Sequence, residues 1–396
     1  MNIITLDVLQ TLGLGVIVFL LGTFIKSRVP FFQKYFIPAP VIGGLIFSII
    51  VFILVQTNTI GFEFDGVLQD FFMNIFFTTI GFTISISVIK ESGKLGAVLA
   101  FVAVLLLVFQ NLLGIGLANL LNINPLLGVA MGSTSMSGGI GSAAAFGPTF
   151  EELGAIGGTT VGIAAATFGL LAGSIVGGPV AKRLIDKNKL TSETTTNQKD
   201  RNNDKEEIEI LSQSRILNAV LTVLLAGGVG SIISYLLNLT GLTFPYYVGG
   251  LFAGAIFTNF ADLRDMDLPM SEINIIGNVS LNLFLSITLM TLNLSALTEL
   301  AIPMIVILLA QVILIALYTS FVTFKAMGKD YEAAVMTAGH VGVGMGQTPN
   351  AVANMTSIIQ EHGPAPTAWF VLPVITVVFI NIFNPIIITL FMNLLS

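Results

Sequence analysis

The chain contains no cysteine and very few charged residues. Its 396 residues include two histidines, and only 10% are Asp, Glu, Lys or Arg. The lack of cysteine excludes disulfides, thiolate metal sites and cysteine nucleophiles within this chain. His340 and His362 are too few for a histidine-based metal site. A soluble domain has about 25% charged residues, so this chain lacks the polar side chains that would cover a water-facing surface.

Apolar residues make up 54% of the chain, and the mean hydropathy is +0.92. They occur in long continuous runs without alternation, which favours membrane helices over a membrane barrel. No basic stretch precedes the first run, so it is interpreted as a membrane span and not as a signal peptide. We expect ten spans, at 4–25, 38–55, 71–89, 96–121, 156–181, 215–238, 245–261, 275–295, 301–324 and 366–394.

Two further stretches, 125–147 and 331–359, are apolar but interrupted by Gly, Ser, Thr, Asn and Pro. We interpret them as re-entrant hairpins, each returning to the side from which it enters the membrane. With the N-terminus outside, all 16 Lys and Arg residues then lie in loops on the inner side. This is the distribution that the positive-inside rule expects. It predicts that both termini are outside and that the polar segment 182–214 is a flexible cytoplasmic linker.

The two halves of the sequence match weakly but in the same order. The matches lie 201 to 208 residues apart and include Gly43 with Gly249, Asn74 with Asn282, Gln110 with Gln311, Gly139 with Gly344, and Pro179 with Pro385. Each half has an odd number of spans, so the second half is upside down relative to the first. The expected fold is an all-α polytopic membrane protein in which 1–181 and 215–396 form an inverted repeat. Such repeats with broken helices are typical of secondary transporters.

The broken hairpins are the expected binding site, because non-helical backbone at membrane depth can bind ions and substrate through peptide groups. Glycine permits the close approach that such a site needs. The expected substrate-binding residues are Ser135, Ser137, Gly138, Gly139, Gly141, Gly344, Gly346, Gln347, Thr348 and Asn350. An alternative interpretation remains open, in which these small residues only let helices pack closely.

No Asp, Glu, Lys or Arg lies in the middle of an expected span. Proton-coupled transporters bury such groups, so we expect coupling to a metal cation held by neutral oxygen atoms. The expected ligands for sodium are Ser133, Thr134, Gly342, Asn278, Asn282 and Asn381. The amides of Asn111 and Asn384 are further candidates for the cavity. Each of these asparagines has the alternative role of a hydrogen bond between helices.

The sequence resembles the bacterial sodium/glutamate symporters over essentially its whole length. The resemblance rests on the strings at 34–45, 110–116, 137–141, 166–170, 177–181, 277–285, 327–334, 338–340 and 344–355. It implies sodium-driven uptake of L-glutamate at the bacterial cytoplasmic membrane, a homodimer, and an elevator-like movement of the hairpins against a dimerising scaffold. The chain departs from the family pattern at Ile140, where a histidine can stand, and at Gln347, where a smaller residue can stand.

Three other functions are alternatives to this hypothesis. A sodium symporter of another carboxylate, such as citrate or malate, would have a related architecture. An ion channel would use the hairpins as a selectivity filter. An intramembrane enzyme is disfavoured, because the spans contain no metal-ligand set and no general acid–base pair. The expected partners are therefore L-glutamate, sodium, the lipid bilayer and a second copy of the chain, with no nucleic acid.

Overall fold

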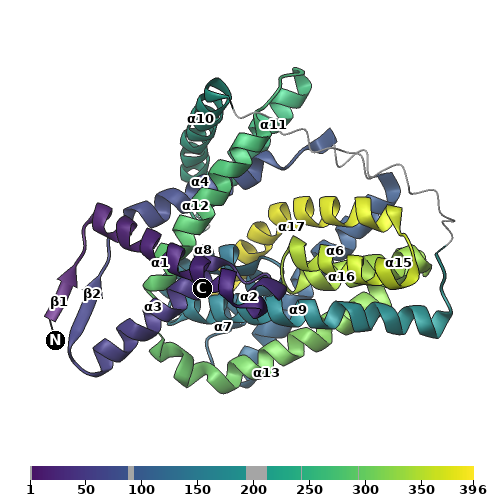
Figure 1. Ribbon diagram of the computed structural model, residues 1–396, viewed down its shortest axis with the longest axis horizontal. Coiled ribbons are helices and arrows are strands. Elements are labelled where there is room, and N and C mark those ends of the chain that lie inside the picture. Colours follow the sequence, from purple (N-terminus) through teal and green to yellow (C-terminus); the bar gives the residue numbers. More distant parts are fainter. Residues whose placement is uncertain (1, 88–92, 193–211, 242, 293) are drawn as a thin grey trace.

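The computed structural model describes residues 2–87, 93–192, 212–241, 243–292 and 294–396, which are mostly helical (Figure 1). The first half contains β1 (Asn2–Thr5), α1 (Val8–Arg28), α2 (Pro30–Lys34), α3 (Ala39–Gln56), β2 (Ile60–Glu63), α4 (Val67–Phe82), α6 (Gly93–Leu120), α7 (Pro125–Val129), the π-helical segment η1 (Ala130–Thr134), α8 (Gly139–Glu152) and α9 (Gly158–Asn188). The second half contains α10 (Gln213–Asn238), α11 (Tyr247–Leu263), α12 (Met270–Met290), α13 (Ser295–Tyr318), the π-helical segment η2 (Thr319–Thr323), α14 (Phe324–Ala326), α15 (Tyr331–Gly344), α16 (Thr348–His362) and α17 (Pro366–Leu395).

The first helix begins later than the sequence predicted. Residues 2–5 are not part of a span but form strand β1, which pairs in parallel with β2. Asp7 then starts α1, because its Oδ1 accepts from the backbone N–H of Gln10 at 2.8 Å while the Gln10 Oε1 accepts from the Asp7 N–H at 3.1 Å. This reciprocal pair is a capping box, which satisfies two N–H groups at a helix start.

Eight helices in the described residues are long and apolar enough to cross a membrane, namely α1, α3, α6, α9, α10, α12, the helix running 300–326, and the part of α17 over 378–395. The two other expected spans correspond to α4, with 16 residues, and α11, with 17 residues. At about 1.5 Å per residue each is roughly 25 Å long, a little less than the apolar thickness of a bilayer. The expectation of ten crossings therefore remains a prediction.

The helix α12 begins inside the segment that was expected to be a cytoplasmic loop. Glu272 lies in its first turn and is only 3% exposed. Its Oε1 accepts a hydrogen bond from the Nε of Arg215, at the start of α10, over 2.9 Å. A buried carboxylate needs such a partner, so the ion pair allows α12 to start about five residues earlier than hydropathy alone suggests.

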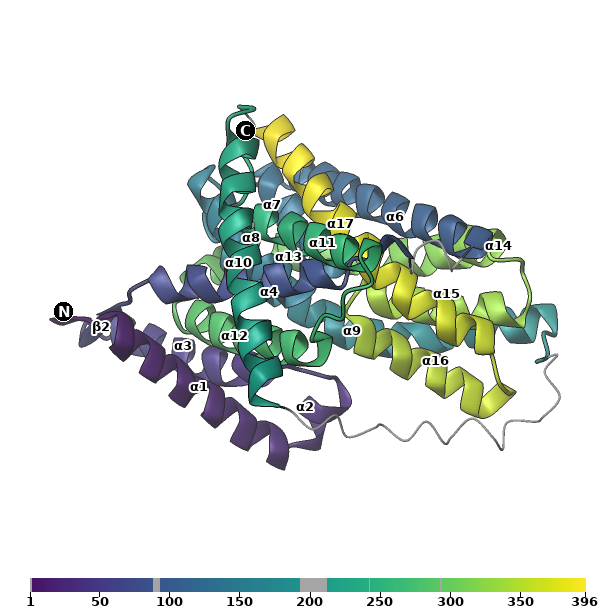
Figure 2. The same cartoon turned by 90° about the horizontal axis from the view of Figure 1, so that it is seen from above.

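The helices form two groups, and the helices of each group pack mostly on one another (Figures 1 and 2). The scaffold group contains α1, α3, α4, α10, α11 and α12, which pack on one another. The broken-helix group contains α6, α7, α8, α9, α13, α15, α16 and α17. Each half of the chain contributes its first three long helices to the scaffold group and its later helices to the broken-helix group. The order of elements is therefore the same in both halves.

The two groups meet mainly along α8, which contacts α12. A methyl group added at Gly141 would lie 3.4 Å from the Phe76 ring and 3.8 Å from Leu281. The Phe146 ring packs edge-on against Tyr247, with 5.4 Å between ring centres. These contacts along α8 are apolar, and two hydrogen bonds between Thr243 and Asn393, at 2.8 and 3.2 Å, join the groups at the end of α17.

Candidate functional site

Both broken stretches are pairs of helices separated by a short non-helical turn. In the first pair, η1 ends at Thr134 and α8 begins at Gly139, whose φ of +69° is in the left-handed region that glycine adopts without strain. In the second pair, α15 ends at Gly344 and α16 begins at Thr348. The pairs reach Glu152 and His362, somewhat beyond the expected ranges 125–147 and 331–359.

The turns of the two pairs lie against each other inside the broken-helix group. A methyl group at Gly139 would be 3.1 Å from the Nε2 of Gln347 and 3.5 Å from the carbonyl oxygen of Gly346. Gln110, on α6, connects the turns directly. Its Nε2 donates to the Gly344 carbonyl oxygen at 2.6 Å, and its Oε1 accepts from the Ser137 hydroxyl at 2.7 Å. One buried glutamine therefore bridges both breaks.

Asparagines from neighbouring helices hold the first turn. Asn111 forms two hydrogen bonds with Ser133, one from its Nδ2 to the Ser133 hydroxyl and one from the Ser133 N–H to its Oδ1, both at 2.9 Å. The Nδ2 of Asn384, on α17, donates to the Ser133 carbonyl oxygen at 3.1 Å. The Ser135 hydroxyl donates to the Gly162 carbonyl oxygen of α9 at 2.7 Å. The kinked backbone is thus stabilised from three different helices.

The second turn is held by α9 in a similar manner. Asn350 donates from Nδ2 to the carbonyl oxygen of Leu170 at 2.8 Å, and Asn354 donates to that of Gly173 at 2.9 Å. Gly342 allows this arrangement, because a methyl group there would lie 2.4 Å from the backbone nitrogen of Ala351. α15 and α16 therefore pack backbone to backbone next to the turn.

Four oxygen atoms in this network are buried and, among the described residues, accept no hydrogen bond: Thr134 Oγ1, Gln311 Oε1, Asn350 Oδ1 and Asn384 Oδ1. In each of the three amides the nitrogen already donates to a backbone carbonyl. The amide oxygens are thereby fixed as free acceptors. An unsatisfied buried polar atom costs about 1–3 kcal/mol. Neutral oxygens are the ligands that hard cations prefer, so the donor set suits a small cation such as sodium.

Several residues expected at the site lie elsewhere. Asn278 and Asn282 are on α12 in the scaffold group, where Asn278 is exposed and Asn282 half-buried. Asn381, on α17, is also half-buried. None of these three bonds to the residues of the two turns among the described residues. Gly141 faces the scaffold group.

Two of the residues that join the turns were not among the expected site residues: Gln110 and Gln311 were noted as a repeat match, and Gln110 also in the string 110–116. Gln110 and Gln311 match across the halves, and α6 and α13 bring them into contact, with Gln311 Nε2 donating to the Gln110 carbonyl oxygen at 2.8 Å. A glutamine inside a long apolar run is a signal that could have marked them as site residues. His340 is buried on α15, and its Nδ1 is 2.9 Å from the hydroxyl of Thr323 in η2.

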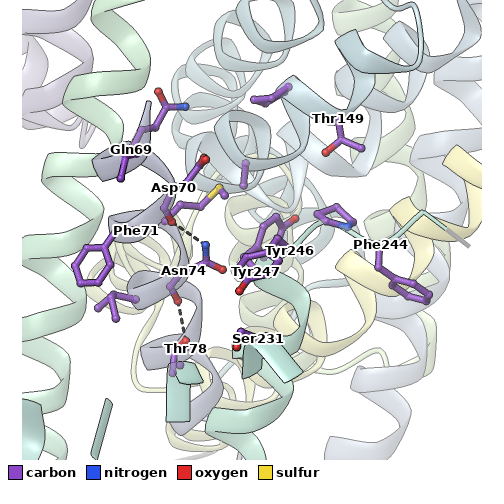
Figure 3. Close-up of a pocket in the computed structure, with 18 of the residues that line it drawn as sticks. Gln69, Asp70, Phe71, Asn74, Thr78, Thr149, Ser231, Phe244, Tyr246 and Tyr247 are labelled. Atoms are coloured by element: carbon purple, nitrogen blue, oxygen red, sulfur yellow. Dashed lines mark hydrogen bonds between the residues drawn. The ribbon is translucent and has the colours of Figure 1, made fainter. Parts of the chain in front are cut away.

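A cavity of about 600 Å³ lies between the two groups (Figure 3). It is bounded by α4, α8, α10, the start of α11 and the segment 243–247. Its polar lining residues are Gln69, Asp70, Asn74, Thr78, Thr149, Glu152, Ser231, Thr243, Tyr246 and Tyr247. Among the described residues, the lining includes two carboxylates and no Lys or Arg, so the cavity favours cations over anions.

Long apolar helices that surround buried, kinked polar segments are the arrangement of a membrane transport protein. A family model described as sodium/glutamate symporter matches residues 4–364. The sodium/glutamate symporter of Escherichia coli K12 is 38% identical over 394 residues, covering 98% of both chains. That of Haemophilus influenzae is 35% identical over 386 residues, covering 96% of both chains. The chain belongs to the sodium/glutamate symporter family, and is a transporter and not an enzyme.

A more distant likeness is found among solved structures. The sodium proton antiporter MjNhaP1 from Methanocaldococcus jannaschii aligns over 98% of both chains, with 15% identity and a TM-score of 0.46. A similarity of this size does not bear on the substrate or the mechanism of this chain.

Proposed function

We propose that this protein takes up L-glutamate together with sodium across a bacterial cytoplasmic membrane. The observation that carries the proposal is the set of buried oxygens at the two helix breaks that accept no hydrogen bond from the described residues. Family membership supports it, because the relatives are named for sodium and glutamate. Both termini are outside and the linker 182–214 is cytoplasmic, as the distribution of Lys and Arg suggests.

Sodium is bound by the neutral oxygens of the network. Thr134, Gln311, Asn350 and Asn384 supply the free acceptors, and the carbonyl oxygens of the turns add to them. These oxygens are buried without a hydrogen bond in the absence of the ion, which is unfavourable. Coordination of sodium satisfies them, and this gain supplies part of the free energy of sodium binding. Since every ligand in the set is neutral, the bound ion brings a net positive charge into the broken-helix group.

The positive charge of sodium explains how an acidic amino acid can bind without an arginine. The two turns lie close to one another, since a methyl group at Gly139 would be 3.1 Å from the Gln347 Nε2. The N–H groups of Ser137, Gly138, Met345 and Gly346 already donate to carbonyl oxygens of the preceding helices, so the peptide groups offered to a substrate are those at the starts of α8 and α16. The N-termini of α8 and α16 begin at these turns, and the positive end of a helix dipole favours a carboxylate. Binding of either ion therefore strengthens binding of the other, which is the coupling that symport requires.

Transport proceeds by an elevator-like movement of the broken-helix group along the scaffold group. The apolar contact along α8 supports this mechanism, because apolar surfaces can slide past one another without breaking directional bonds. The two hydrogen bonds between Thr243 and Asn393 open during the movement. The shared element order of the two halves supports an inverted repeat, which gives two states of similar energy that open to opposite sides. The scaffold group forms the contact of a homodimer.

The proposal is tested by uptake into vesicles that contain the purified protein. An inward sodium gradient should concentrate labelled L-glutamate inside, while an equal potassium gradient should not. Unlabelled L-glutamate should compete more strongly than citrate or malate. Equal uptake without sodium would show that transport is not coupled to sodium. Stronger competition by citrate or malate would show that this acid, and not glutamate, is the substrate.

A further inference from the structure

The cavity between the two groups carries two carboxylates, one from each group. Asp70 lies in the first turn of α4, in the scaffold group, and Glu152 is the last residue of α8, in the broken-helix group. Both side chains are exposed, and they repel one another across the cavity. Neither carboxylate makes a hydrogen bond or an ion pair to the described residues. A positively charged group between them would therefore be favoured.

A tyrosine hydroxyl in the same cavity also lacks a partner. Tyr247 lines the cavity at the start of α11 and is 0% exposed (Figure 3). Its ring stacks on Phe77, with 4.0 Å between ring centres, and meets Phe146 edge-on, so the ring is fixed in place. Among the described residues, no group donates to its hydroxyl or accepts from it. A buried hydroxyl in this condition is unfavourable, so the cavity suits a polar ligand.

An apolar groove adjoins this polar cavity. It has a volume of about 360 Å³ and lies between α4, α10 and α12. Phe71, Ile75 and Leu224 line both spaces, so the two are neighbours. The other residues of the groove are apolar apart from Ser280, namely Phe72, Val220, Val223, Ile275, Ile276 and Val279. The cavity and the groove thus form one amphipathic site.

The polar and apolar parts of this site lie at the depths that a membrane lipid requires. Asp70, Glu152 and the segment 243–246 are at or next to helix ends, which lie near the surface of a membrane. The groove is lined from the interior of helices. Val220, its lining residue nearest to an end of α10, is already seven residues beyond Gln213, or about 10 Å. A headgroup at the carboxylates therefore places an acyl chain in the groove.

We propose that this amphipathic site binds one phospholipid with a primary ammonium headgroup, of the phosphatidylethanolamine type. The ammonium lies between Asp70 and Glu152, and one acyl chain lies in the groove. Its N–H groups can donate to both carboxylates and to the Tyr247 oxygen. Among the described residues no Lys or Arg lines the cavity, so an anionic headgroup such as that of phosphatidylglycerol is repelled. The lipid connects the two groups of helices, whatever substrate the protein carries.

The headgroup is tested by native mass spectrometry of the full chain in detergent, titrated with phosphatidylethanolamine or with phosphatidylglycerol of the same acyl chains. One phosphatidylethanolamine should bind about tenfold more tightly than phosphatidylglycerol, the effect of hydrogen bonds to a charged group. Asp70→Asn with Glu152→Gln should remove this preference. Each single replacement should reduce it in part, and the single variants serve if the double variant does not fold.

Glu151→Gln is the matched control for the carboxylates. Glu151 is the acid next to Glu152 but lies outside the cavity lining, and a glutamine there can still accept from the Thr159 N–H. This variant should keep the full preference for phosphatidylethanolamine.

The groove is tested by filling it. Val279→Trp should weaken phosphatidylethanolamine binding at least severalfold, because the indole takes the space of the acyl chain; Val279 is 52% exposed, so the fold can accept the larger side chain. Val306→Trp is the control, since Val306 is 40% exposed on α13 and outside the groove. Glycerophosphoethanolamine, which has the headgroup without acyl chains, should not displace the lipid at equal concentration.

Any of three results would overturn the inference. The first is equal affinity of the unmodified protein for the two lipids, or a preference that survives without both carboxylates. The second is an equal change in Val279→Trp and Val306→Trp. The third is displacement by glycerophosphoethanolamine, which would make the site one for a free amine. A protein that binds the lipid as expected but shows no sodium-driven glutamate uptake would contradict the proposed function alone.

Discussion

Gln311 donates a hydrogen bond from its Nε2 to the backbone oxygen of Gln110 at 2.8 Å, so two glutamines at matching places in the halves of the sequence are in direct contact. Gln110 in turn bridges the turns at Ser137 and Gly344. In the part of the chain that the structure describes, no group donates to the Gln311 Oε1. The contact between the two halves is therefore also a part of the proposed ion site.

Replacing Asn384 by alanine should weaken the effect of sodium on stability. At a sodium concentration one hundred times its Kd, binding stabilises the folded protein by about 2.7 kcal/mol. A tenfold loss of affinity would reduce this to about 1.4 kcal/mol. Thermal unfolding in detergent, with sodium or choline chloride, measures the difference.

Ser286→Ala is the control for this experiment. The Ser286 hydroxyl is also buried without a hydrogen-bond partner among the described residues, but it lies on α12 in the scaffold group. This variant should keep the full stabilisation by sodium. An equal loss in both variants would show that the free oxygens of the turns have no special role in binding the ion.

Gly139→Ala should reduce transport at least tenfold. The residue has φ of +69°, where a side chain costs about 1–2 kcal/mol, and its methyl group would lie 3.1 Å from the Gln347 Nε2. Gly116→Ala, within α6, has nothing within 4 Å and should be neutral or stabilise the protein by up to about 1 kcal/mol. Uptake rates normalised to the amount of folded protein compare the two, and equal activity would contradict the proposed close contact of the turns.

The cross-link between Thr243→Cys and Asn393→Cys should stop transport, because it joins the two groups that are proposed to move. The double-cysteine protein should transport normally when no bifunctional thiol reagent is added. Ser87→Cys with Asp262→Cys is the matched pair within the scaffold group, where the native side chains are 3.1 Å apart, and its cross-link should leave transport unchanged. Full activity of the first pair when completely cross-linked would exclude a sliding movement of one group along the other.

Single cysteines at the ends of the broken stretches should test whether each hairpin returns to its own side. Leu120→Cys and Ile156→Cys flank the first stretch, and Lys329→Cys and Gln360→Cys flank the second; all four positions are exposed. On intact cells, a membrane-impermeant maleimide should label the first two and not the last two. Labelling of only one residue of either pair would show that the stretch between them crosses the membrane.

The sequence predicted the long helices well, because continuous apolar runs leave few alternatives to a membrane helix. It also located both helix breaks from their Gly, Ser and Pro content. It did not predict strand β1, since the apolar residues 2–5 extend the first apolar run and only the pairing with β2 makes them a strand. Helix α12 began earlier than expected because hydropathy does not reveal the ion pair of Glu272 with Arg215.

The partners of the site residues were beyond sequence reasoning. Asn384 and Asn278 are both asparagines in apolar helices, yet one bonds to the first turn and the other is exposed on α12. Which amide faces the site depends on the rotation and packing of its helix, and no local pattern fixes these. Asn74 was visible only as a repeat match, and the structure adds the cavity beside it.

The central claim is that sodium binds at the two helix breaks and that glutamate binds beside it. A cryo-electron microscopy structure determined with sodium and L-glutamate tests this most directly. The account predicts ion density within coordination distance of the free oxygens of Asn384, Asn350 or Gln311, with glutamate density against the turns at 135–139 and 344–348. Ion density on α12 between Asn278 and Asn282, with the turns empty, would contradict it.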